Sequence, residues 1–365
     1  MSLANTILQS KISNYQQEGL DKYLRLESTY GAMQAFTDDT GMIPSGQGVI
    51  KGEDAENIAK SGYMTNGPKI NVIKKDNITI GTSGTTSCFA TTPAGDSVQV
   101  GVTYNTLDFD LVIPLNATDY NYVGWDDNLG VALQERMIAA REAINAACLA
   151  KLETDKNQIQ AGNLLDFFAD SGANEFDIPL AQKDDMFNYM RALFTRLKLN
   201  KTKRHIGNEI DYASNVYKQF NQGVANSTNT NWQFGQFGFN EIQGSSSDTI
   251  WYQDTSIADG VSVRGTSYEI PVGSLALINA IDYAYYEDPY KREAVKNGGE
   301  GEIFSTELPG FPAGFKWGVK RKINCDSGRE NESWQFECKF ALISPYVENI
   351  ATDPTVIQKF QVKTA

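Results

Sequence analysis

The sequence predicts an α+β fold in which one very long helix separates strand-rich segments. Residues 126–158 have apolar side chains at helical spacing, contain no proline and have no glycine after Gly130. Residues 98–115 alternate apolar and polar side chains in two runs, which is typical of strands. The chain has 365 residues, of which 41% are hydrophobic. It is therefore long enough for a large core and for about two domains.

Composition excludes several classes of protein. The net charge is −13, which does not favour a basic nucleic-acid-binding surface. No apolar run approaches the roughly 18 residues of a membrane span, and residues 1–20 lack the apolar centre of a signal peptide, so we expect synthesis in the cytoplasm. The cysteines show no CxxC spacing, which argues against a zinc site or a disulfide framework. Cys325 and Cys338 could face each other across a hairpin, as thiols in a reducing compartment.

The first 36 residues have a weak amphipathic helical pattern, and a loop-like stretch follows at 38–54. This segment resembles an arm that packs on something else more than a conventional first domain.

Strand patterns begin at Ile70. Residues 70–73 and 78–80 are β-rich, a Gly/Ser/Thr-rich stretch follows, and strict alternation then covers 98–104 and 107–115. The slip around 105–106 predicts a bulge or a change of face. Together these strands predict a long two-stranded excursion with a flexible tip. Because an isolated hairpin is marginal in water, it would rest on a partner surface. Two strands of an ordinary sheet are an equally good interpretation of the pattern.

The long helix is predicted to bury one narrow stripe, and at about 1.5 Å per residue it would be roughly 45 Å long. The stripe consists of Leu129, Leu133, Met137, Ile144, Cys148 and Leu152. Asp126 and Asp127 stand at its start, where negative charge is stabilised by the helix dipole, and Asp184 and Asp185 stand at the start of a second helix. We therefore interpret both pairs as helix-start residues and not as metal ligands.

The remainder of the chain alternates between helices, loops and strands. We expect helices at 184–199 and 209–220, a strand around residues 205–206, and a loop through about 240. Further strands are expected at 241–243, 249–252 and 274–286, the last of them buried, followed by a solvated loop at about 287–302. Residues 315–323 and 334–343 are predicted to form a hairpin.

Residues with catalytic potential are scarce. His205 is the one histidine, and it follows several cations that should disfavour its protonation, so we expect an exposed residue at a loop or strand end. No GxSxG, P-loop, GxGxxG or HExxH motif is present. The basic run from Arg191 to Arg204 could contact phosphate, but we favour a solvated helix end or a contact with an acidic neighbouring subunit. The same alternatives hold for Lys316, Lys320, Arg321 and Lys322. We expect no enzyme activity, cofactor or metal.

The order of these parts, with several stretches of sequence, resembles the major capsid protein of tailed bacteriophages, which has the Hong Kong 97-type fold. The stretches are KRHIGNEIDYASNVYKQF, FGQFGFNEIQGSSSD, GSLALINAIDYAYYEDP, and FKWGVKRKINCD with ESWQFECKFALISPYVENI. The resemblance is one of layout and covers most of the chain. It implies an N-terminal arm at 1–66, an extended β-hairpin loop at 67–115, a peripheral domain at 116–180 with the spine helix 126–158, an axial domain at 181–286, and a return to the peripheral domain at 287–365.

The resemblance also implies a function: self-assembly as hexamers and pentamers into the icosahedral shell of a virion, formed in the host bacterial cytoplasm around double-stranded DNA that is not bound by sequence. Scaffold, portal and decoration proteins are the further partners it suggests, with no membrane. Because no extension precedes Met1, we expect a separate scaffold or none. Some family members crosslink a lysine of the extended loop to an asparagine. Lys69, Lys74 and Lys75 lie near the base of the loop, but no acceptor can be matched, so no crosslink is predicted.

The residues expected at subunit interfaces lie on the arm, on the extended loop or in basic segments of the remaining chain. They are Leu20, Tyr23, Leu24, Lys74, Lys75, Phe89, Arg136, Arg141, Arg196 and Arg204. One alternative is an encapsulin-type compartment shell, which differs in enclosing an enzyme; the long arm favours the phage interpretation. Another is a β-rich surface or carbohydrate-binding protein, suggested by Trp232, Trp251 and the Asn/Ser/Thr-rich loops. That alternative predicts a monomer and an export signal, and the signal is not seen.

Overall fold

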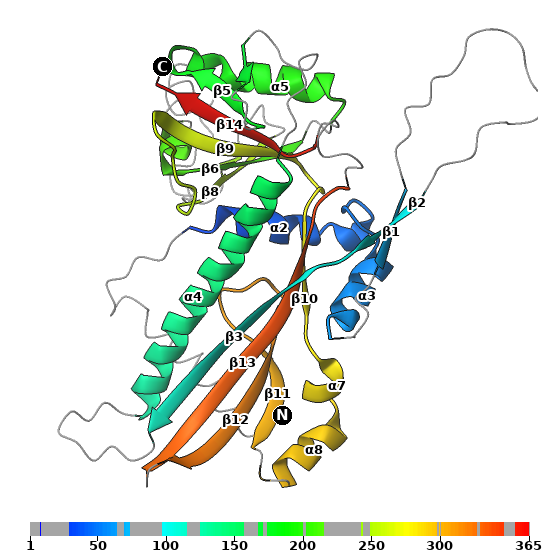
Figure 1. Cartoon of the computed structure of the whole chain (residues 1–365), viewed down its shortest axis with the longest axis vertical. Helices are drawn as coiled ribbons and strands as arrows, with labels where there is room; N and C mark the ends of the chain where they lie inside the picture. Colours follow the sequence, from blue (N-terminus) through cyan, green and yellow to red (C-terminus); the bar gives the residue numbers. More distant parts are fainter. Residues whose placement is uncertain are drawn as a thin grey trace, which may run out of the picture.

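The computed structural model describes residues 8, 29–63, 69–73, 97–114, 125–156, 167–170, 174–199, 202–214, 242–243, 249–297, 299, 301–326, 329–346 and 355–364. The described part mixes helices with three sheets in an elongated body (Figure 1). A five-stranded sheet forms the lower part in that view, and a seven-stranded sheet forms the upper part. This arrangement confirms the predicted α+β class.

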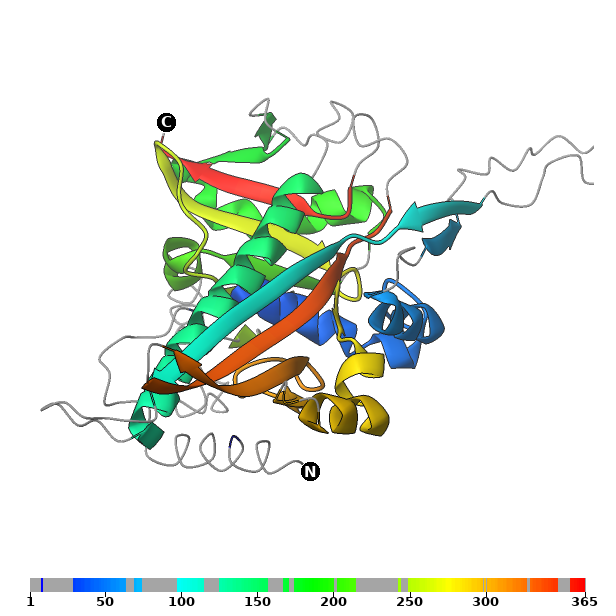
Figure 2. The same cartoon turned by 60° about the horizontal axis from the view of Figure 1, so that its bottom comes forward.

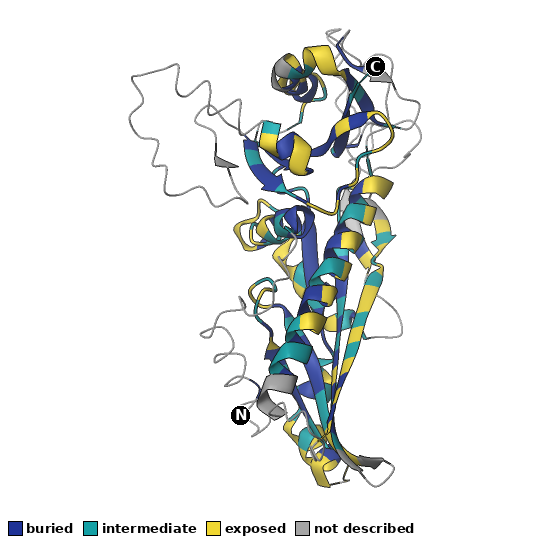
Figure 3. Ribbon diagram, turned by 90° about the vertical axis from the view of Figure 1, so that its left-hand side faces the viewer, coloured by how far each residue is buried: buried dark blue, intermediate teal, exposed yellow. Residues whose placement is uncertain are grey.

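Helix α4 (Trp125–Thr154) runs diagonally from the seven-stranded sheet to the far end of the five-stranded sheet (Figure 1). All six residues of the predicted stripe are buried in the largest core cluster. Buried and exposed faces alternate along the helix, as expected for an apolar stripe with a solvated back (Figure 3). The predicted long helix is therefore confirmed, ending at Thr154 and not at Gln158.

The five-stranded sheet is organised around β13 (Arg329–Ile343). Strand β3 (Tyr104–Pro114) pairs with one edge of β13. Strands β12 (Lys316–Asp326) and β10 (Ala276–Ala280) pair with successive parts of the other edge. Strand β11 (Glu302–Glu307) extends the sheet beyond β12. In Figure 2, β3 lies alongside α4. The predicted hairpin of β12 and β13 is confirmed. Its register places Cys325 opposite Glu330 and Cys338 opposite Leu107, so the two cysteines do not face each other.

The seven-stranded sheet mixes parallel and antiparallel pairs. In spatial order its strands are β4 (Ala169–Asp170), β5 (Phe176–Pro179), β14 (Gln358–Lys363), β9 (Val263–Pro271), β6 (Lys203–Gly207), β8 (Thr249–Gln253) and β7 (Ile242–Gln243). Strand β14, from the end of the sequence, lies between β5 and β9. A separate aromatic cluster, including Phe176 and Phe360, packs β5 and β14 against α5 (Met186–Arg196). The 3-10 helix η4 (Leu180–Asp185) precedes α5, so part of the predicted second helix has a tighter turn.

Strands β1 (Lys69–Ile73) and β2 (Ser97–Gly101) pair antiparallel and form a two-stranded ribbon. The predicted pairing is confirmed for these two strands, whereas residues 107–115, which were assigned to the same excursion, lie mostly in β3 of the five-stranded sheet. Ile70 anchors the ribbon in a small cluster with Ile58 and Ile278. The interruption before β3 falls at residues 102–103, slightly earlier than the predicted slip. The predicted tip of the excursion lies outside the described residues.

The stretch predicted as loop at 38–54 is partly helical. It contains the end of α2 (Gly31–Thr40), the 3-10 helix η2 (Ile43–Ser45) and the start of α3 (Gly52–Ser61). Helix α2 carries small side chains that let it pack closely in the main core, where Ala32, Ala35 and Phe36 are buried. A side chain at Gly31 would meet the carbonyl of Gln253 at 2.5 Å, which shows how close that approach is. These residues are therefore part of the chain's own core.

Two further predictions are corrected. The strand expected at 274–286 is β10 followed by the short helix α7 (Tyr283–Tyr286), because Asp282 accepts a hydrogen bond from Tyr285 N at 3.0 Å and caps a new helix start. The loop expected at about 287–302 contains helix α8 (Pro289–Asn297), which has proline in its first turn and buries only Val295 of its residues. A helix that is polar nearly all round has little apolar period to detect.

Candidate functional site

The basic run of the sequence enters the interior on β6. Lys203, Arg204 and His205 are buried, with His205 fully so. Strand β6 lies between β9 and β8, so neighbours cover both of its edges. The expectation of an exposed histidine and a solvated basic segment is therefore wrong at this end of the run. Buried charges require partners, and each of the three has an acidic one within the chain.

His205 lies between two carboxylates. Its Nδ1 is 2.7 Å from Oε1 of Glu269 on β9, and its Nε2 is 2.6 Å from Oδ2 of Asp211, which follows β6. Lys203 Nζ is 3.1 Å from the other oxygen of Glu269, and the ring of Trp251 lies 4.2 Å from that of His205. Burial alone would lower the pKa of His205, but the charges and hydrogen bonds of Asp211 and Glu269 raise it to about 9. His205 is therefore positively charged at neutral pH, contrary to the prediction.

This arrangement serves structure better than catalysis. Both ring nitrogens of His205 are engaged by carboxylates, and the ring is fully buried, so it cannot take a proton from a substrate. The contacts connect β6, β9 and the helical residues at 209–214. Asn208 adds a hydrogen bond from Asp211 N to its Oδ1 at 2.9 Å, which holds the start of that helix.

Arg204 connects the seven-stranded sheet to α2. Its Nε is 2.6 Å from Oδ1 of Asp39, and its Nη1 is 3.5 Å from Oδ2 of Asp38. Asp39 also accepts a hydrogen bond from Leu275 N at 3.0 Å, just before β10 of the five-stranded sheet. Burial raises the pKa of Asp39, and Arg204 opposes that shift. One carboxylate therefore contacts both sheets, and Arg204 is an internal residue instead of the surface contact that was predicted.

The other end of α2 is held by Asn145 and Asp254. Asn145 Nδ2 on α4 donates to both carboxylate oxygens of Asp254, at 3.1 and 3.0 Å. Asn145 Oδ1 accepts from Met33 N at 3.0 Å, and Asp254 Oδ2 accepts from Ala32 N at 2.9 Å. These side chains satisfy amide groups at the start of α2 that have no partner within the helix. Burial raises the pKa of Asp254, and the hydrogen bonds that its carboxylate accepts act in the opposite direction.

The C-terminal end of α4 joins the seven-stranded sheet through Glu153. Its carboxylate contacts Lys156 at 2.5 Å, Lys359 of β14 at 3.1 Å and the hydroxyl of Tyr268 at 2.7 Å. Burial alone would raise the pKa of Glu153, but these hydrogen bonds and the Lys359 charge lower it to about 2. Lys359 is also 3.0 Å from Glu175, next to β5. Apolar packing therefore anchors the N-terminal end of the long helix, and charged contacts anchor its C-terminal end.

Comparisons with known proteins place these features beside solved structures. No protein-family model and no curated protein match the sequence. This chain is similar to phage capsid structures. The capsid asymmetric unit of cyanophage Pam1 has 10% identity and a TM-score of 0.47, covering 82% of this chain and 85% of the other. The capsid asymmetric unit of cyanophage A-1(L) has 12% identity and a TM-score of 0.44, covering 85% of this chain and 92% of the other. The SrpI encapsulin of Synechococcus elongatus has 9% identity and a TM-score of 0.37, covering 74% of this chain and 79% of the other.

The predicted interface residues lie in different surroundings. Arg136 on α4 and Arg196 on α5 are exposed. Arg141 is half-buried, with its guanidinium 5.9 Å from the ring of Tyr30. Arg204 is buried, as described above. Six others lie outside the described residues: Leu20, Tyr23, Leu24, Lys74, Lys75 and Phe89.

Two further observations bear on the alternatives. Trp251, which suggested carbohydrate binding, is buried beside His205 and offers no ring face to a sugar; Trp232 lies outside the described residues. Among the helices of the described residues, none has both the length and the hydropathy of a membrane-spanning segment.

Proposed function

We propose that this chain is the major capsid protein of a tailed bacteriophage and has the Hong Kong 97-type fold. The observation that carries the proposal is the paired ribbon β1–β2, anchored at its base beside a body that α4 spans from one sheet to the other. A two-stranded ribbon has too small an apolar surface to be stable by itself in water. It would gain that surface by lying on a neighbouring copy, as a shell subunit requires.

The buried charges support a structural role. His205, Arg204 and Glu153 each connect different elements of the chain, and the histidine is enclosed on both ring nitrogens. Such contacts fix the relative positions of α2, α4 and the two sheets. A shell subunit has to keep its shape while it is loaded by its neighbours, and a net charge of −13 suits a wall around packed DNA.

The division into parts follows the proposal. Residues 1–66 would include the arm, although α2 and α3 within them pack in the chain's own core. Residues 67–115 would include the extended loop, although β3 within them belongs to the five-stranded sheet. Residues 116–180 and 287–365 would form the peripheral domain, and 181–286 the axial domain. Copies of the chain would assemble as hexamers and pentamers in the host cytoplasm and become part of the virion. Arg136 and Arg196, which are exposed, remain the described candidates for contacts between copies.

The test is electron microscopy of the recombinant chain in negative stain, with light scattering after size exclusion. Closed shells, capsomers or tubes are expected. A matched variant replaces residues 74–96 by a short Gly-Ser turn, which leaves the β1–β2 pairing in place. It should keep the circular dichroism and Tm of the parent but lose closed shells. A 40.3 kDa monomer at every concentration and salt would contradict the proposal. Shells that form only around a co-expressed enzyme would indicate a compartment instead.

A further inference from the structure

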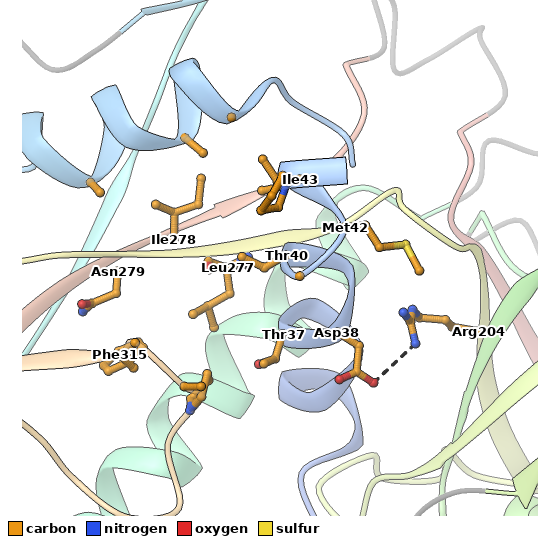
Figure 4. A pocket seen from close by; sticks show the side chains of 18 of the residues that line it. Thr37, Asp38, Thr40, Met42, Ile43, Arg204, Leu277, Ile278, Asn279 and Phe315 are labelled. Atoms are coloured by element: carbon orange, nitrogen blue, oxygen red, sulfur yellow. Dashed lines mark hydrogen bonds and ion pairs between the residues drawn. The ribbon is translucent and has the colours of Figure 1, made fainter. Parts of the chain in front are cut away.

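A cleft of about 810 Å³ lies where α2, η2 and α3 meet β10 and the loop at 312–315 (Figure 4). Its walls are mostly apolar, including Ile43, Leu277, Ile278 and Phe315. Polar groups gather where α2 faces the seven-stranded sheet, among them Asp38 and Arg204. A concave, mostly apolar space of this size with a few fixed polar groups has the character of a small-molecule site.

The polar end has an excess of negative charge. Arg204 has two carboxylates beside it, and it is much closer to Asp39, at 2.6 Å, than to Asp38, at 3.5 Å. One guanidinium therefore serves two carboxylates, which leaves one negative charge unmatched. Asp39 is fully buried, whereas half of the Asp38 side chain is exposed. The unmatched charge is accordingly presented at Asp38.

Asp38 is also held in place. The hydroxyl of Tyr252 donates to its Oδ2 at 2.5 Å, and Tyr252 itself accepts a hydrogen bond from Arg204. A carboxylate that is oriented before a ligand arrives loses less entropy on binding. In Figure 4, Asp38 lies beside Thr37 at one side of the cleft, with Leu277 and Phe315 farther along it.

We propose that this cleft binds an amphipathic organic cation, with an aromatic or aliphatic body along the apolar wall and an ammonium group on Asp38. A carboxylate ligand would be repelled by the same residue. A neutral ligand would gain the apolar contacts but not the ion pair. The proposal concerns the single chain and does not depend on its assembly.

The test is isothermal titration calorimetry of the full chain with three ligands that share one body: phenylbutylamine, phenylbutanol and phenylbutyrate. The amine should bind more tightly than the alcohol by roughly two- to five-fold at low salt, because the ion pair is partly exposed. The carboxylate should bind most weakly. Added salt should reduce the advantage of the amine.

Two variants locate the site, and a third is the control. Asp38→Asn should make the amine and the alcohol bind equally, and Ala59→Phe, which fills the cleft from α3, should weaken both. Glu53→Gln changes an exposed acid of α3 that does not line the cleft and should leave all affinities unchanged. Circular dichroism checks that each variant is folded.

Equal binding of the amine and the alcohol by the parent chain would overturn the proposal. So would amine binding that Ala59→Phe does not weaken. Absence of amine binding by the parent chain would overturn it as well; if a folded Ala59→Phe variant then fails to assemble, the cleft is a protein-docking groove.

Discussion

His205 Nε2 lies 2.6 Å from Oδ2 of Asp211, and this contact is fully buried. Because His205 is the only histidine of the chain, its imidazole signals in NMR have one possible assignment. We expect them to titrate near pH 9. In Asp211→Asn the midpoint should move to lower pH, since one of the two carboxylates that favour the charged ring is removed. A midpoint near the ordinary value of 6.5 in the parent chain would contradict the assigned contacts.

The same pair predicts how stability depends on pH. The folded-state pKa of His205 is raised from 6.5 to about 9, so its contribution is complete below 6.5 and is lost as the pH rises through about 9. The free energy of unfolding should fall over this interval by up to about 3 kcal/mol. Urea unfolding at several pH values measures the fall. His205→Gln should be less stable at neutral pH and should lack this component of the slope; an unchanged slope would rule out His205 as its source.

Replacing Asn145 should loosen α2 from α4. Asn145→Leu leaves Met33 N without its acceptor and removes both hydrogen bonds to Asp254, which is buried. Leaving buried polar groups unsatisfied costs about 1–3 kcal/mol each, so the unfolding free energy should drop by at least that amount. Glu135→Gln, on the exposed side of the same helix, is the control and should change stability little. Similar stabilities for Asn145→Leu and the control would show that the network adds nothing.

Glu153 should contribute to stability in acid. Its pKa is lowered from 4.5 to about 2, so its contribution is present above 4.5 and is lost as the pH falls towards 2. Because 44% of the side chain is exposed, solvent screening limits the contribution to about 1 kcal/mol or less. Thermal unfolding of Glu153→Gln should show a lower Tm than the parent at neutral pH and a difference that narrows below pH 4.5. A constant difference across that range would mean that the loss is one of packing.

Elements with a strong apolar period were predictable from the sequence. The stripe from Leu129 to Leu152 and the alternation in β3 both report burial on one face, and the structure buries the predicted residues of α4. Helix α8 was missed because it packs through little more than Val295. Its sequence is polar overall and therefore offers few apolar side chains that could mark a buried face.

The buried charges could not be predicted from neighbouring residues. Arg204 pairs with Asp39, 165 positions away, and His205 with Glu269, 64 positions away. In the sequence, Arg204 and His205 are immediately preceded by other cations and are not flanked by acids. That pattern suggests a solvated basic segment. Asp211, six positions from His205, was the one local signal, and a strand followed by a turn can bring such a residue back.

The position of β14 between β5 and β9 has a consequence for synthesis on the ribosome. Both neighbours are translated well before residues 358–363, yet neither can complete its hydrogen bonding on that side until those residues have emerged. The seven-stranded sheet is thus divided until translation has passed Lys363. A nascent chain cannot display the finished sheet before these residues emerge, so in the proposed shell the order of translation would delay association between copies until then.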